Sequence, residues 1–203
     1  MALCAPVLAQ ARAAKPAKAI TILVVGDSLS AEYGLRRGSG WVALLEQQLA
    51  QDKLSATVIN ASISGDTTSG GRSRLPALLA QHHPTHVILE LGANDALRGL
   101  PLQMTQANLS AMAQAARTAG ARVVITGMRV PPNYGREYGE AFAALFAKVA
   151  RSEHAALVPF LLKGIADAPQ ATALFQADRI HPIEAAHPTM LANVWQVLKP
   201  LLR

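Results

Sequence analysis

Four segments of the sequence carry polar side chains of the kinds that acyl transfer needs. They are Gly26-Asp27-Ser28-Leu29-Ser30, Asn60–Thr68, Leu91-Gly92-Ala93-Asn94-Asp95 and Asp178-Arg179-Ile180-His181-Pro182. A serine hydroxyl is a weak nucleophile until a histidine accepts its proton, and a carboxylate must hold that histidine in the correct tautomer. Asp178 precedes His181 by three residues, so its carboxylate can reach Nδ1 while Nε2 faces Ser28. These segments predict a hydrolase with Ser28, Asp178 and His181 as catalytic residues.

The oxyanion of the tetrahedral intermediate needs fixed hydrogen-bond donors. Candidate donors are the backbone N–H groups of Ser28 and Gly65 and the side-chain amide of Asn94. Gly65 has no side chain that would block a close backbone approach. A second set of residues is apolar and is expected to line the substrate pocket: Leu97, Leu100, Met128, Val130 and Pro131.

Five short apolar runs precede or separate these segments and predict buried strands of a parallel sheet. The runs are Ile20–Val25, Thr57–Asn60, His86–Leu91, Arg122–Thr126 and Leu157–Leu161. Apolar residues at helical spacing lie between or after them, as in Trp41, Leu44, Leu45 and Leu49 after a candidate N-cap, Ser39. The alternation predicts a three-layer α/β sandwich, in which ligands bind beyond the carboxyl ends of the strands. The four polar segments fall at that edge.

Composition favours one globular domain, expected over residues 20–203. The chain of 203 residues is 51% hydrophobic and 16% charged, which excludes an intrinsically disordered protein. The net charge of +6 would suit nucleic acid, anionic lipid or an anionic substrate. The basic residues are scattered, however, so no nucleic-acid partner is expected. From residue 20 onward no apolar run reaches the roughly 20 residues of a membrane span, so no stable membrane insertion is expected.

The N-terminal residues 1–19 are interpreted as the remnant of a secretory signal peptide. Residues 2–9 are apolar, and small residues alternate at Ala9-Gln10-Ala11 and Ala11-Arg12-Ala13, as at signal cleavage sites. The alternative is an unprocessed N-terminal extension. A signal peptide predicts a periplasmic or secreted protein. Cys4 is the one cysteine of the sequence, so no intrachain disulfide can form.

With these motifs in order, the chain from Ile20 onward resembles the SGNH (GDSL-type) hydrolases, and within them the bacterial thioesterase I, lysophospholipase and arylesterase group. Further segments that carry the resemblance are Leu75–Leu79, Glu90–Asp95, Leu97-Arg98-Gly99, Met128–Tyr134 and Glu140-Ala141-Phe142. The resemblance implies a flavodoxin-like sheet of five parallel strands with helices on both faces. It implies that Ser28 attacks, that His181 is first base and then acid, and that Asp178 orients His181. It also implies that Ser28, Gly65 and Asn94 form the oxyanion hole, in a monomer that needs no metal or cofactor.

Two positions depart from the family pattern. Arg179 stands where the family usually has glycine, so either a positive φ strains its backbone or a cation stands beside the catalytic residues. Ala96 stands where the group commonly has glycine, in a segment, Ala96–Pro101, that is expected to be a mobile loop. Both departures concern rate and substrate range and not the class of reaction.

Several other polar residues are expected to be structural. Asp27, Asp66 and Asp95 each adjoin a candidate site residue and are interpreted as hydrogen-bonding supports of their loops. Ser30 is expected to cap a helix that follows Ser28, and His187 is expected to pack within or on the last helix.

The leading functional hypothesis is a serine esterase and thioesterase that acts on aryl esters, acyl thioesters and possibly lysophospholipids. A small-molecule substrate with an acyl chain fits the apolar residues Leu97, Leu100 and Met128. The alternatives are a carbohydrate deacetylase, which would have a more polar pocket, and a non-catalytic lipid- or glycan-binding module. A binding module would be expected to lack one or more of the candidate catalytic residues.

Overall fold

A computed structural model describes residues 19–202. The strands are β1 (Ile20–Gly26), β2 (Ala56–Asn60), β3 (His86–Glu90), β4 (Arg122–Thr126) and β5 (Ala156–Val158). The helices are α1 (Trp41–Gln51), α2 (Thr68–His82), α3 (Ala93–Leu97), α4 (Leu102–Thr118), α5 (Arg136–Ser152) and α6 (His187–Leu198). Short 3₁₀ helices are η1 (Pro132–Tyr134), η2 (Ala171–Leu174), η3 (Glu184–Ala186) and η4 (Lys199–Leu202). The expected signal remnant lies, except for Ala19, outside the described residues.

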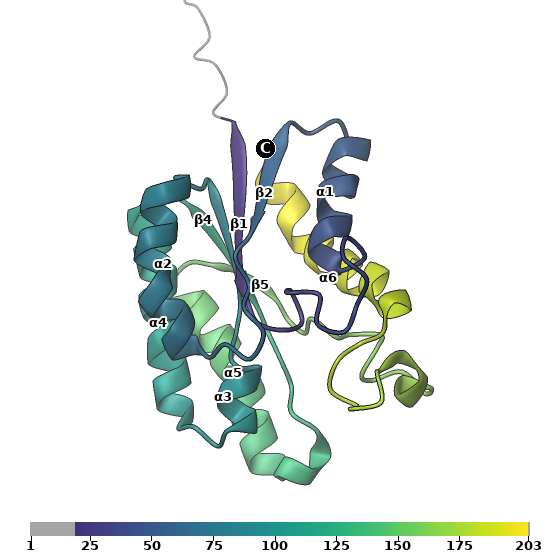
Figure 1. Cartoon of the computed structure of the whole chain (residues 1–203). Coiled ribbons are helices and arrows are strands. Elements are labelled where there is room, and N and C mark those ends of the chain that lie inside the picture. Colours follow the sequence, from purple (N-terminus) through teal and green to yellow (C-terminus); the bar gives the residue numbers. More distant parts are fainter. Residues whose placement is uncertain (1–18, 203) are drawn as a thin grey trace, which may run out of the picture.

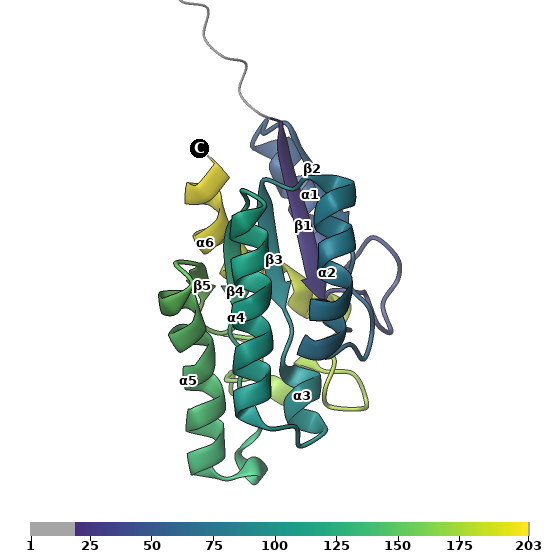
Figure 2. The ribbon, with the colours of Figure 1, turned by 90° about the vertical axis from the view of Figure 1, so that its left-hand side faces the viewer.

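The five strands form one parallel sheet in the order β2-β1-β3-β4-β5. Figure 1 shows α2, α3, α4 and α5 on one side of the sheet and α1 and α6 on the other. The view turned by 90° shows α2, α4 and α5 side by side in front of the strands (Figure 2). This arrangement is the predicted three-layer α/β sandwich with a five-stranded parallel sheet.

Burial explains why the strands have this composition. All five residues of β3 are buried, and so are the last five of β1. A strand that is covered by helices on both faces has no solvent side, so it is nearly continuously apolar. The aromatic residues Trp41, Phe142 and Phe146 are at most 1% exposed and pack in the core between sheet and helices.

The strand order places a crevice beside β1. The chain leaves β1 through α1 on one face and leaves β3 through α3 and α4 on the other. Neighbouring strands whose connections diverge in this way open a crevice at their carboxyl ends, where α/β proteins bind ligands. Gly26 pairs with Glu90 in this region, and a Cβ at Gly26 would lie 2.8 Å from Oε2 of Glu90. Glycine is therefore required where β1 ends.

Most predicted strand ends agree with the structure to within one residue, but the end of the fifth strand and the start of the first helix differ more. The fifth strand ends at Val158 and not at Leu161, because Pro159 has no N–H to continue the ladder. The first helix begins at Trp41 after Gly40, and Ser39 does not cap it. Instead, the Glu32 carboxylate accepts from the N–H groups of Gly38 and Gly40 at 3.0 and 2.8 Å. A carboxylate from the preceding turn thus takes the place of the predicted Ser39 cap.

Candidate active site

The structure brings the three predicted catalytic side chains together at the carboxyl edge of the sheet. Ser28 follows β1, and Nε2 of His181 lies 2.9 Å from its Oγ. Nδ1 of His181 lies 2.6 Å from Oδ2 of Asp178. The chain hydroxyl–imidazole–carboxylate is therefore continuous, and it joins residues 153 positions apart in sequence. This geometry lets the imidazole accept the hydroxyl proton while the carboxylate fixes its tautomer.

The loop that carries Asp178 and His181 is closed at its base. The N–H of Gln176 donates to the carbonyl of His181 at 2.7 Å, and Phe175 pairs with Pro182. Inside the loop, Oδ1 of Asp178 accepts from the N–H groups of Ile180 and His181 at 2.9 and 3.1 Å. The hydrogen bond with His181, reinforced by these two N–H groups, lowers the pKa of Asp178 to about 2. Asp178 is therefore ionised at neutral pH, as support of an imidazolium requires.

Arg179 has a φ of 59° and lines the same pocket as Ser28. The sequence raised two possibilities for Arg179, a strained backbone or a cation beside the catalytic residues. The structure shows both, because the backbone is left-handed and the arginine lines the pocket. A residue with a Cβ pays roughly 1 kcal/mol or more in this conformation. A left-handed backbone conformation, which glycine adopts most easily, is thus held here by an arginine.

Asn94 lies at the start of α3 and faces the segment around Ser28. Its Nδ2 donates to Oδ2 of Asp27 and to the carbonyl of Asp66, both at 3.0 Å. Both amide hydrogens are therefore engaged, and they fix the direction of the Asn94 side chain. The backbone N–H groups of Ser28 and Gly65, in contrast, donate no hydrogen bond within residues 19–202.

A pair of buried carboxylates lies directly behind Ser28. Asp27 is 1% exposed and Glu90 is 0% exposed. The N–H of Asp27 donates to Oε2 of Glu90 at 3.3 Å, and the hydroxyl of Ser30 donates to the same oxygen at 2.7 Å. Burial raises the pKa of Asp27 to about 6, and burial together with the nearby Asp27 charge raises the pKa of Glu90 well above its usual range. Burial therefore favours the protonated form of the Glu90 carboxyl group.

The predicted structural roles of the three aspartates are confirmed. Oδ1 of Asp27 accepts from the N–H of Leu29 at 3.0 Å. Asp66 accepts from Nε of Arg74 at 2.8 Å, and Asp95 accepts from the N–H of Thr68 at 2.9 Å. The first two bonds are local to the segments after β1 and β2, and the third joins the segment after β3 to the start of α2.

Two smaller expectations have different outcomes. His187 is 2% exposed, and its Nδ1 accepts from the N–H of Trp41 at 3.0 Å, so it packs as expected and also satisfies the start of α1. The expectation that Ser30 caps a helix is wrong, because its hydroxyl donates to Glu90 instead. Sequence reasoning did not single out Glu90. An acidic residue at the end of an otherwise apolar strand was the available signal.

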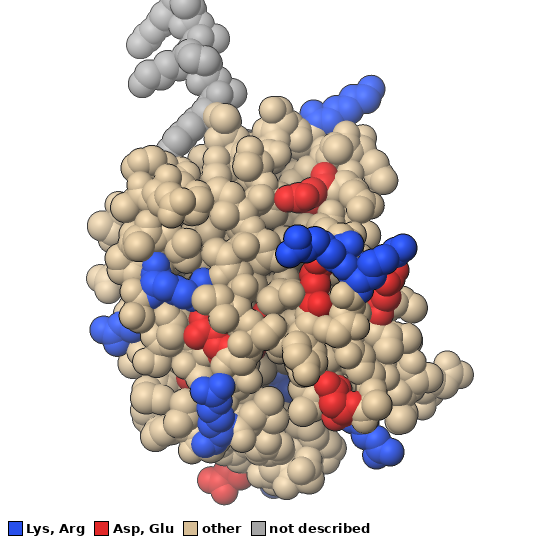
Figure 3. Space-filling model, viewed as in Figure 1, with Lys and Arg blue, Asp and Glu red and all other residues tan. Residues whose placement is uncertain are grey.

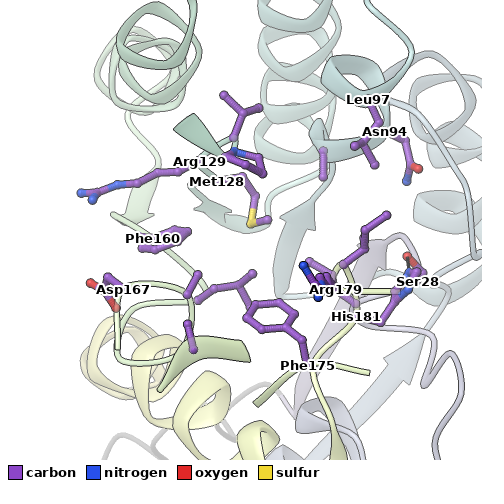
Figure 4. Close-up of a pocket in the computed structure, with 18 of the residues that line it drawn as sticks. Ser28, Asn94, Leu97, Met128, Arg129, Phe160, Asp167, Phe175, Arg179 and His181 are labelled. Carbon is purple, nitrogen blue, oxygen red and sulfur yellow. Dashed lines mark hydrogen bonds between the residues drawn. The ribbon is translucent and has the colours of Figure 1, made fainter. Parts of the chain in front are cut away.

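A cavity of about 870 Å³ opens beside Ser28. Figure 4 shows Ser28, His181 and Asn94 at one end, and Arg129, Phe160 and Asp167 at the other. The predicted pocket residues Leu97, Met128, Val130 and Pro131 line it, as do apolar residues that were not predicted: Phe142, Phe160, Leu162 and Phe175. Leu100 and Gly65 are not among its lining residues. The segment Ala96–Pro101 is not wholly a loop, because Ala96 and Leu97 belong to α3 and Ala96 is 2% exposed.

Among residues 19–202, no group of three or more His, Cys, Asp or Glu side chains is arranged to hold a metal ion. No described helix is both long enough and apolar enough to span a membrane. Figure 3 shows basic and acidic side chains interspersed over the face viewed, without a block of one sign.

Comparison with known proteins gives consistent matches. The model of the GDSL-like Lipase/Acylhydrolase family matches residues 24–188. The chain is 53% identical over 186 residues to Esterase TesA of Pseudomonas aeruginosa, which covers 92% of this chain and 91% of that protein. It is 43% identical over 188 residues to Thioesterase 1/protease 1/lysophospholipase L1 of Escherichia coli strain K12, with coverage of 93% and 88%.

Solved structures match over nearly the same length. The crystal structure of TesA has a TM-score of 0.86 and 52% identity, and the match covers 89% of this chain and 99% of that one. The psychrotrophic esterase EstA from Pseudoalteromonas sp., in a structure inhibited by monoethylphosphonate, has a TM-score of 0.83 and 40% identity. That match covers 90% of this chain and 98% of that one.

Proposed function

Because the chain belongs to the GDSL-like lipase/acylhydrolase family and is a hydrolase that acts on esters, we propose that it hydrolyses aryl esters, acyl thioesters and lysophospholipids through an acyl-enzyme on Ser28. The observation that carries this proposal is the continuous chain from Ser28 Oγ through His181 to Asp178, with distances of 2.9 and 2.6 Å.

In the proposed mechanism, Nε2 of His181 accepts the hydroxyl proton as Oγ of Ser28 attacks the acyl carbon. The tetrahedral intermediate then collapses, and the leaving alcohol or thiol takes the proton from His181. Water attacks the acyl-enzyme in the reverse sequence, and the carboxylic acid leaves with Ser28 restored. Asp178 remains ionised throughout, because its low pKa suits a carboxylate that faces an imidazolium.

We assign the oxyanion hole to the N–H groups of Ser28 and Gly65 and the amide of Asn94. The two backbone N–H groups have no acceptor in the described chain, so they are available to a developing oxyanion. The Asn94 amide is held by Asp27 and the carbonyl of Asp66, and it must share or exchange one of these bonds to donate. Such preorganised donors contribute mainly in the transition state.

The lining of the cavity favours acyl-chain substrates over acetylated carbohydrates. Its side chains are mostly apolar, including Met128, Phe142 and Phe160. Each methylene of a substrate that leaves water for such a surface contributes roughly 0.8 kcal/mol to binding. A sugar in the same place would leave its hydroxyl groups without partners. Similar proteins bear names of the three activities proposed here: arylesterase, thioesterase and lysophospholipase.

A panel of substrates tests the proposal. Purified protein is assayed with p-nitrophenyl esters, acyl-CoA, lysophosphatidylcholine and acetylated xylo-oligosaccharide. The expected result is hydrolysis of the first three, with kcat/KM for the carbohydrate at least about 100-fold below that for p-nitrophenyl butyrate, about 2.7 kcal/mol. Preferential release of acetate from the carbohydrate would favour the deacetylase instead, and no hydrolysis of any substrate would favour a binding module.

We also propose a periplasmic or secreted location and a monomeric protein. Support for the location comes from the apolar residues 2–9 and the small residues around Ala11 in the sequence. Cell fractionation with N-terminal sequencing of the periplasmic protein tests the location, and sedimentation of the purified protein tests the monomer. Cytoplasmic protein that retains residues 1–13 would contradict the first proposal.

A further inference from the structure

The exposed large hydrophobic side chains of residues 19–202 all lie in segments at the carboxyl edge of the sheet. They are Tyr33, Ile63, Leu97 and Ile180, with exposed fractions of 50%, 53%, 46% and 46%. We call these four residues the apolar rim. Leu97 and Ile180 line the mouth of the cavity beside Ser28, and the ring of Tyr33 lies 4.4 Å from that of His181. Isolated exposed hydrophobic residues are ordinary, but four at the edge that holds the catalytic residues, two of them at the cavity, are of the kind that marks an interaction site.

The backbone holds these side chains in their exposed positions. Ile63 donates its N–H to the carbonyl of Gly26 and accepts from the N–H of Asp66, both at 3.0 Å. The carbonyl of Tyr33 accepts from Nε2 of Gln176 at 3.0 Å. Leu97 ends α3, and Ile180 is anchored by its N–H on Asp178. Exposure is therefore built into the fold, and these side chains are not turned inward by a small rearrangement.

Arginines accompany the apolar rim. Arg98 follows Leu97 and donates to the carbonyl of Gly65 at 2.7 Å, Arg179 precedes Ile180, and Arg129 lies over the ring of Phe160 at the far end of the cavity. All three are exposed, and in the described part of the chain none has a carboxylate within ion-pair distance. Asp167 is the one exposed carboxylate among the cavity-lining residues. Near the apolar rim, Arg98 and Arg179 outnumber the exposed carboxylate of Asp178, so the mouth of the cavity is apolar with a net positive border.

We propose that the apolar rim docks this protein onto a lipid surface that carries anionic headgroups. Apolar side chains that project from a fixed backbone enter the boundary between headgroups and acyl chains, while arginines beside them attract anionic lipid. A soluble ester needs no such border outside the cavity. Docking in this orientation points the mouth of the cavity at the lipid, so a single acyl chain enters it without crossing bulk water.

The proposal concerns binding to a lipid surface, which can be measured independently of hydrolysis. Binding is therefore measured on lipid that the enzyme cannot cleave: sucrose-loaded vesicles of dialkyl ether phosphatidylglycerol and dialkyl ether phosphatidylcholine, sedimented with the full chain. Turnover of soluble p-nitrophenyl butyrate, measured on the same samples, reports the proposed function separately. Absence of this turnover would overturn the proposed function and leave the binding result to be judged alone.

A matched pair of variants identifies the surface. Ile63→Glu places a carboxylate in the apolar rim at a residue with no role in the proposed chemistry. Ala80→Glu adds the same charge on an exposed position near the other end of α2, at the opposite edge of the sheet. We expect Ile63→Glu to lower the vesicle partition coefficient at least about tenfold and Ala80→Glu to change it by less than about twofold. Both should keep soluble turnover within about twofold of wild type.

A second experiment varies the lipid headgroup and the ionic strength. Partition into vesicles with half phosphatidylglycerol should exceed that into pure phosphatidylcholine several-fold, and 0.5 M NaCl should remove most of this difference. Equal losses in Ile63→Glu and Ala80→Glu would overturn the proposal, because general repulsion by the added charge would then explain both. Failure of the wild-type protein to sediment with either vesicle would overturn it as well and would favour a purely soluble substrate.

Discussion

The side chain of Asn94 is held by Asp27, the residue that immediately precedes Ser28. Nδ2 of Asn94 lies 3.0 Å from Oδ2 of Asp27, and Asp27 uses its other oxygen to accept from the N–H of Leu29 at 3.0 Å. One buried carboxylate therefore fixes both the turn that presents Ser28 and the amide assigned to the oxyanion hole. Behind it, Glu90 holds the N–H of Asp27.

Asn94→Ala should lower kcat by about 10²–10³-fold with little change in KM, because its amide acts on charge that develops in the transition state. Asp27→Asn should lower kcat by about tenfold. The carboxylate of Asp27 accepts from Leu29 and from Asn94, and an asparagine side chain has one acceptor oxygen only, so its NH₂ group would face one of these two donors. The double variant should be no worse than about twofold below Asn94→Ala. Additive losses would show that Asp27 acts independently of Asn94.

Asp27 also gives the protein an unusual pH dependence of stability. Burial raises its folded pKa from 3.8 to about 6, so between these values the folded state binds more protons than the unfolded state. The contribution of Asp27 to the free energy of unfolding is therefore larger at pH 4 and decreases as pH rises through about 6. We expect the Tm of wild type minus that of Asp27→Asn to decrease over this range.

Asp52 provides a control of opposite sign for that measurement. Its pKa is lowered, first by the hydrogen bond from Lys199, so its stabilising contribution is present above the unfolded pKa of 3.8 and is lost as pH falls below it. The Tm of wild type minus that of Asp52→Asn should therefore increase, slightly, as pH rises from 2.5 to 5. If the Tm difference changed with pH in the same direction for the Asp27 and Asp52 variants, the raised pKa of buried Asp27 would be contradicted.

Arg179 allows charge and backbone strain to be separated. Arg179→Asn removes the cation but tolerates the φ of 59°, Arg179→Lys keeps the cation, and Arg179→Gly removes both cation and strain. We expect kcat/KM for acyl-CoA to fall several-fold in the Asn and Gly variants at low salt and to persist in the Lys variant. Neutral aryl esters should change by less than about twofold. Equal effects on both substrate classes would point to backbone geometry.

Leu97 and Leu100 form a matched pair for the acyl pocket, because only the first lines the cavity. Leu97→Ala should lower kcat/KM by about tenfold for p-nitrophenyl esters of eight carbons or more, and should leave the acetate ester nearly unchanged. Leu100→Ala should show no dependence on chain length. A uniform loss along the ladder for Leu97→Ala would mean that this residue supports α3 and does not contact the chain.

Much of the site was predictable because its residues stand in short motifs at the ends of apolar strands. Parallel strands bring their carboxyl ends to one edge, so Ser28, Asn94 and His181 could be expected to meet. The start of helix α2 was not predicted, because its sequence includes adjacent glycines and Pro76 and shows no clear apolar stripe. Its start is fixed by Asp95, which lies 27 residues away and accepts from Thr68.

The buried carboxylates and the apolar rim could be recognised only in the three-dimensional structure. Glu90 ends a strand that is otherwise apolar except for His86, and nothing in its own segment shows that Asp27 and Ser30 bind it. The members of the apolar rim come from four separate segments, each with a single exposed large hydrophobic residue that carries no pattern. That Leu97, at the end of α3, lines the cavity and Leu100, beyond that helix, does not follows from packing and not from their spacing.

The central claim is that Ser28 is the nucleophile, and covalent labelling tests it most directly. The protein is treated with a fluorophosphonate ester, digested, and mapped by mass spectrometry, in parallel with Ser28→Ala. We expect one label per chain on Ser28, loss of ester hydrolysis in proportion to labelling, and neither labelling nor hydrolysis above background in a folded Ser28→Ala. A label on another residue, or substantial turnover by Ser28→Ala, would contradict the account.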